Sequence, residues 1–166
     1  MTEKTLHDLF HDTLKDIYYA EKKILAALPK MEKAAKSKEL KAAFLKHRGE
    51  TEIQVKRLEE VFGIIEEKAV GKKCPAIDGI LEEGAELMDD YKGTSVLDAA
   101  LVGAAQAVEH YEIARYGTLV RWAEELGLDD AASLLDETLA EEKQTDEDLS
   151  AMADASVNQN AQIAAE

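Results

Sequence analysis

Four long stretches of this chain repeat apolar residues at spacings of three and four, which is the period of one face of an α-helix. They run over residues 5–28, 37–62, 96–126 and 130–154, and neither of the two prolines falls inside them. The pattern predicts an all-α fold, a four-helix bundle of residues 1–153 that forms a single domain. Residues 154–166 are weakly apolar, and we expect them to form a frayed tail.

The connections between these stretches indicate how the helices are arranged. Residues 63–76 are an extended connection, and a shorter amphipathic helix follows over residues 76–91. So long a connection predicts that the second and third long helices run in the same direction, with the short helix crossing over between them. Pro29 either ends the first helix or kinks it into a short continuation through Ala34.

Each apolar face carries a carboxylate. Glu109 and Glu112 lie three residues apart and therefore share one face of the third long helix. Glu21, Glu50 and Glu142 lie on the apolar stripes of the other three helices. A carboxylate on a buried face is costly unless it is paired or bound to a cation. Four such helices therefore predict a metal site near the middle of the bundle.

The two halves of the chain repeat this arrangement. Gln54 follows Glu50 by four residues, and Asp146 follows Glu142 by four. This symmetry predicts two divalent cations in an oxygen-rich site. The candidate ligands are Glu21, Glu50, Gln54, Glu109, Glu112, Glu142 and Asp146. Gln54 and Asp146 could equally hydrogen-bond a ligand instead of contacting the metal.

Other interpretations of the same residues stay open. Glu21 and Glu109 could be boundary positions that pair with a lysine or arginine, and a bundle with hydrogen-bonded carboxylates could hold no metal at all. His47 and His110 are predicted to be packing groups or partners of ligands, not ligands. Cys74 is predicted to be a small buried residue. Tyr116, one turn after Glu112, is the tyrosine of most interest near the site.

Charge and composition exclude several classes of partner. The formal net charge of −15 argues against nucleic acid, since phosphate binding needs a surplus of lysine and arginine. No stretch approaches the roughly 18 apolar residues of a membrane span, and the first residues have no apolar leader. A single cysteine in 166 residues favours a reducing compartment, so the expected location is the cytoplasm.

Several motifs together resemble a known family. They are Asp16-Ile-Tyr-Tyr-Ala-Glu21, Glu50-Thr-x-x-Gln54, Gln106-Ala-Val-Glu109-His-Tyr-Glu112, Glu137-Thr-Leu-x-Glu141-Glu142 and, in the crossover, Lys73-Cys74-x-Ala-x-x-Gly79. Over roughly residues 5–152 the chain resembles the YciE/YciF bacterial stress-protein family of the ferritin-like superfamily. The resemblance implies a bundle with an additional crossover helix, a homodimer and a centre of two metal ions.

One departure from ferritins and rubrerythrins affects the choice of metal. Their second and fourth helices carry Glu-x-x-His pairs, whereas Ile53 and Thr145 stand three residues after Glu50 and Glu142 here. Iron or manganese is expected, with magnesium or calcium as alternatives. The resemblance implies a stress-linked protein with an oxidase- or peroxidase-type activity on O₂, peroxide or Fe(II). The alternative is a non-catalytic protein whose metal stabilises the bundle, and the sequence does not say whether the protein is an enzyme.

Overall fold

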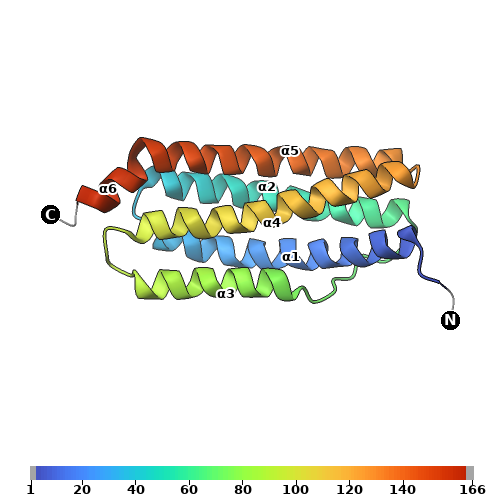
Figure 1. The fold of residues 1–166 in the computed structure, drawn as a ribbon, viewed down its shortest axis with the longest axis horizontal. Helices are drawn as coiled ribbons and strands as arrows, with labels where there is room; N and C mark the ends of the chain where they lie inside the picture. Colours follow the sequence, from blue (N-terminus) through green and yellow to red (C-terminus); the bar gives the residue numbers. More distant parts are fainter. Residues whose placement is uncertain (1–2, 164–166) are drawn as a thin grey trace.

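The computed structural model describes residues 3–163, and every regular element in that range is helical. The elements are α1 Leu6–Ala34, α2 Lys38–Ile64, α3 Pro75–Asp90, α4 Leu97–Glu125, α5 Asp129–Met152, a π-helical turn η1 Ala153–Val157 and α6 Asn158–Ile163 (Figure 1). The predicted all-α fold is confirmed. Within residues 3–163, no helix is long and apolar enough to cross a membrane.

The four long helices α1, α2, α4 and α5 form the bundle, and α3 lies outside it. α1 packs on α2, α4 packs on α5, and the two pairs meet through α2 against α5 and α1 against α4. α2 and α4 run in the same direction, while α3 returns along the outside of α1 and α4 (Figure 1). The predicted crossover is therefore confirmed.

Local sequence signals account for the helix ends. The Thr5 hydroxyl accepts a hydrogen bond from the Asp8 backbone, and the Asp8 carboxylate accepts one from the Thr5 backbone, which forms a capping box. Ser37 caps α2 in the same position. Gly127 takes the left-handed conformation, with φ of 71°, in the turn between α4 and α5.

The structure decides between the two alternatives at Pro29. α1 continues through Pro29 to Ala34, because a helix interior can lose one backbone hydrogen bond when its apolar face remains packed. The chain also stays helical beyond residue 154 as far as Ile163, and Val157 is buried. Burial of this side chain explains why the segment does not fray as expected. Residues 164–166 lie outside the described residues.

The apolar face of each helix builds one core. In α1 the buried row includes Phe10, Leu14, Ile17, Ile24 and Leu28. Leu9 is 48% exposed, since it lies about 100° around the helix from Phe10. Two ties hold α3 and its approach to α1: the Tyr19 hydroxyl donates to Asp78, and the Lys72 backbone donates to the Lys15 carbonyl.

Candidate metal centre

Five ionisable side chains meet inside the bundle, where each of the four long helices contributes at least one. α1 supplies Glu21, α2 supplies His47, α4 supplies Glu109 and Glu112, and α5 supplies Glu142. None is more than 4% exposed. We refer to these five residues as the central cluster. Their helical spacing places them on the same inward-facing stripes as the core residues.

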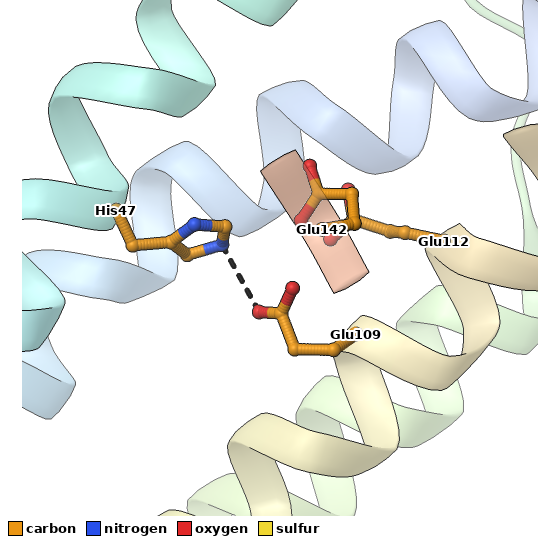
Figure 2. A group of neighbouring side chains, drawn as sticks. All are labelled: His47, Glu109, Glu112 and Glu142. Carbon is orange, nitrogen blue, oxygen red and sulfur yellow. Dashed lines mark ion pairs between the residues drawn. The ribbon is translucent and has the colours of Figure 1, made fainter. Parts of the chain in front are cut away.

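The distances within the central cluster suit a cation. His47, Glu109, Glu112 and Glu142 each offer a ligand atom, and these atoms all lie within 4.8 Å of one another. Figure 2 shows the imidazole of His47 facing Glu109, with Nε2 of the ring 3.1 Å from Oε1 of the carboxylate. Glu21 belongs to the same group, since its charge contributes to the raised pKa of Glu112.

Many polar atoms in this cluster have no hydrogen-bond partner among the described residues. They include both carboxylate oxygens of Glu112 and of Glu142, Oε2 of Glu21 and of Glu109, and Nδ1 of His47. A buried polar atom without a partner costs about 1–3 kcal/mol. So many acceptors beside one base are expensive in a protein interior, and a bound cation would satisfy them together.

The pKa values follow from this crowding. Burial raises the pKa of Glu21 to about 7, although the Tyr116 hydroxyl, which donates to this carboxylate, acts in the opposite direction. Burial, and then the charge of neighbouring glutamates, raises the pKa of Glu112 and Glu142 well above the ordinary range. Burial alone would lower the pKa of His47, but Glu109 and Glu50 outweigh it and raise the value to about 10.

Glu50 and Gln54 lie beside the central cluster on α2. Oε2 of Glu50 is 3.8 Å from Nδ1 of His47, and this oxygen is buried without a hydrogen-bond partner. Gln54 is fully buried and donates through Nε2 to Glu141 at 3.0 Å. This bond fixes which end of the amide faces Glu141, and the carbonyl Oε1 is left without a partner. Both residues therefore retain an oxygen that could serve a metal.

Asp146 is engaged elsewhere. Its two carboxylate oxygens contact Nε2 of Gln106 at 3.2 Å and Nε2 of His110 at 3.1 Å. Both partners come from α4, so the three residues tie α4 to α5. The structure thus brings Glu21, Glu109, Glu112 and Glu142 together, places Glu50 and Gln54 next to them, and gives Asp146 other partners.

His47 is the member of the cluster that sequence reasoning expected in a lesser role. It lies on the apolar stripe of α2, one turn before Glu50, and is 4% exposed. The sequence shows His47 as the first of three polar residues on this stripe, the other two being Glu50 and Gln54. The helical period alone does not show that the ring reaches α4, because this depends on how α2 rotates against its neighbours.

The donor set fits a divalent transition metal. Carboxylate oxygens suit magnesium, calcium and manganese, while an imidazole nitrogen adds affinity for iron or zinc. The four acids of the central cluster would carry −4 when ionised, which two divalent ions would neutralise. The atoms without partners, their mutual distances and the mixed nitrogen and oxygen donors therefore all agree with a metal centre.

Comparisons with known proteins place the chain in a family. Residues 5–162 match the family described as "Domain of unknown function (DUF892)". Protein YciF of Escherichia coli is 44% identical over 163 residues, or 98% of each chain. The crystal structure of this E. coli stress protein superposes with a TM-score of 0.89, covering 94% of this chain and 99% of YciF.

A second solved structure agrees. YcfI from Rhodopseudomonas palustris, which is provisionally described as a structural protein, is 48% identical and superposes with a TM-score of 0.87. The match covers 89% of this chain and 94% of YcfI. These similarities extend over nearly the whole length of all the chains compared. The chain therefore belongs to the DUF892 family and is a homologue of the stress protein YciF.

Proposed function

We propose that this protein is a stress-associated metal protein, with a ferritin-like centre of two iron or manganese ions that reacts with O₂ or peroxide. The observation that carries the proposal is the central cluster, in which four buried acids and one histidine leave most of their polar atoms without partners. Its relation to a stress protein supports the physiological setting.

The residues proposed to hold the metals are the five of the central cluster, with Glu50 and Gln54 as further oxygen donors. Asp146 stays outside this set because both its oxygens already contact α4. When bound, the metals would supply one-electron redox chemistry toward an oxygen species. The chain holds them rigidly, since the ligands come from helices and not from loops.

The surrounding residues orient the proposed ligands. Tyr116 is fully buried and donates to Glu21, which fixes the position of that carboxylate. Arg57 binds Glu141 through two nitrogens, and Glu141 in turn holds the amide of Gln54. Such outer partners set the geometry of a metal site nearly as strongly as the ligands do.

A second candidate function is a non-catalytic one, in which the metals only stabilise the bundle. The description of YcfI as a structural protein favours it for that relative. Under either function we propose that the protein forms a homodimer in the cytoplasm, as the resemblance to the YciE/YciF family and the single cysteine suggest.

The deciding experiment measures metal content and turnover on the same preparations. We expect near two iron or manganese ions per chain, and consumption of peroxide or oxidation of Fe(II). The Glu109→Gln/Glu142→Gln variant should lose both metal and activity. Glu147→Gln, an exposed position on the same helix, should keep them.

The outcomes separate the two functions. Metal without turnover in the wild-type protein would support the structural role and reject the redox one. Absence of transition metal, together with a melting temperature that chelation leaves unchanged, would reject both.

A further inference from the structure

A cavity of about 300 Å³ lies between the four bundle helices, in the half of the bundle that contains the turn from α1 to α2. Its lining is largely apolar and includes Ile24, Leu28, Met31, Phe44, Val108 and Leu149. Protein interiors are normally packed with few voids larger than a water molecule. A partly open cavity of this size beside a polar cluster is therefore a candidate binding site.

The inner end of the cavity reaches the candidate metal centre. His47, Glu50 and Glu109 line it together with the apolar residues. All three have a buried polar atom without a partner: Nδ1 of His47, Oε2 of Glu50 and Oε2 of Glu109. A molecule in this cavity would therefore have an apolar body and would meet the candidate metal centre at its inner end.

The outer end opens between α2 and α5. Lys46 and Asp148 line the cavity and are also exposed at the surface, where Nζ of Lys46 is 3.5 Å from Oδ2 of Asp148. The same nitrogen is 3.5 Å from Oε1 of Glu50. Exposed ion pairs of this kind contribute little net stability, so this mouth would open at small cost.

Size and charge define the class of occupant. At roughly 30 Å³ for each atom, the share that water takes in the liquid, the cavity holds about ten non-hydrogen atoms. Fe(II), O₂ or peroxide would need no apolar chamber of that volume. The lining carries three carboxylates, those of Glu50, Glu109 and Asp148, and one ammonium group, that of Lys46, so its charge favours a neutral molecule over an anion. A neutral hydroxyl can both donate and accept a hydrogen bond.

We propose that this cavity binds a compact apolar organic molecule with one hydroxyl group, which lies at the inner end and faces the candidate metal centre. The inference rests on the proposed function, because the hydroxyl end of the molecule would lie beside the proposed metals. The binding itself depends only on the shape and lining of the cavity, so the two can be tested separately.

The probe for the test is 2-naphthol, whose bicyclic body and single hydroxyl match the cavity. Its fluorescence is titrated with metal-loaded wild-type protein, and we expect saturable binding. Ala105 lines the cavity one turn before Glu109, so Ala105→Leu should weaken binding at least tenfold. Ala107→Leu, an exposed position on the same helix, should bind within twofold of wild type.

A second pair of variants tests the same location if Ala105→Leu fails to fold. Ala43 lines the cavity from α2, and Ala42 next to it is exposed. Ala43→Leu should also weaken binding, and Ala42→Leu should not. Equal binding by all four variants would overturn the location, whatever the affinity.

Proximity to the metal is tested by comparing protein loaded with Co²⁺ and with Zn²⁺. The paramagnetic Co²⁺ should speed relaxation of the bound 2-naphthol protons, while Zn²⁺ should not. Metal content is measured on the same samples. Protein that holds metal but binds no probe overturns this inference and leaves the proposed function standing. Protein that binds the probe but no metal overturns the proposed function instead.

Discussion

Two polar groups lie side by side in this bundle, one buried and one that extends from the interior to the surface, and they are built differently. The first is the central cluster. The second, which we call the Arg57 network, consists of Arg57, Thr138, Glu137, Glu141 and Gln54. In the network, Arg57 binds both oxygens of Glu141 at 2.7 and 2.8 Å and lies 3.2 Å from Glu137 and from Thr138.

The two groups differ in how much positive charge they contain for their acids. The Arg57 network has one guanidinium bound to two carboxylates, and among its atoms only Oε1 of Gln54 is buried without a partner within the described residues. The central cluster places four acids around one histidine and satisfies few of their atoms. A buried polar network that is only partly satisfied destabilises a fold unless something else supplies the missing partners. The comparison therefore makes the central cluster the place where a cation could supply the missing partners.

Removal of metal from the central cluster should cause the largest loss of stability. With free metal at about a thousand times its dissociation constant, binding stabilises the fold by about 4 kcal/mol. For a chain of this length, chelation should then lower the melting temperature by about 10 °C. Differential scanning calorimetry before and after dialysis against a chelator measures this change in melting temperature. An unchanged melting temperature would mean that the cluster needs no cation.

The two groups should respond to pH in opposite directions in metal-free protein. The pKa of Glu21 rises from 4.5 to about 7 on folding, worth on the order of 3 kcal/mol. Stability from this raised value is fully present below pH 4.5 and is lost as pH rises through about 7. His47, whose pKa rises to about 10, acts in the same direction at higher pH.

Glu141 provides the opposite case. Burial alone would raise its pKa, but Arg57 and Gln54 outweigh burial and lower it, so its contribution is lost as pH falls. Urea denaturation at several pH values, in wild type and in Glu21→Gln, isolates the central cluster. We expect the wild type to lose stability between pH 5 and 8 and the variant to lose less. Equal slopes would contradict the assignment to Glu21.

Breaking the Arg57 network should cost about 2 kcal/mol, because Arg57→Met leaves Glu141 without its cation in a half-buried position. Urea denaturation measures the loss. Arg48→Met, on the same helix but with a more exposed side chain 3.7 Å from Glu52, is the control and should change stability little. The variant should also weaken metal binding, since Gln54 would lose its anchor through Glu141.

The smallest expected effect is that of Tyr116→Phe. Loss of the hydroxyl leaves Glu21 without its hydrogen bond and should cost about 1 kcal/mol in metal-free protein. The pKa of Glu21 should rise further, because the bond from Tyr116 lowers it. A pH series of denaturation curves detects both changes. Tyr91→Phe, at an exposed position, should show neither.

Helix content and topology could be predicted from the sequence because each depends on a local signal. The apolar periodicity predicted the four long helices, and the length of the 63–96 connection predicted that α2 and α4 run in the same direction. The end of α1 could not be predicted in the same way. Whether Pro29 stops a helix depends on packing of the residues after it, and Met31 is buried here.

The candidate site shows the same limit. Periodicity placed Glu21, Glu109, Glu112 and Glu142 on inward faces, and the structure buries all four. Periodicity does not fix how far each helix is rotated or which partners a side chain finds. His47 therefore reaches Glu109 across the bundle, and Asp146, which lies on the stripe of α5, instead pairs with Gln106 and His110.

The crossover through α3 has a consequence for the order of folding. It divides the bundle into two helical hairpins, α1 with α2 and α4 with α5, each joined by a short turn and each made of contacts between near neighbours in sequence. Such hairpins form quickly, whereas contacts across the long connection come later. The first hairpin carries only Glu21 and His47 of the central cluster, and the second carries the other three. High-affinity metal uptake would thus mark the docking of the two hairpins, and an incompletely folded chain would have no complete site with which to take up the ion.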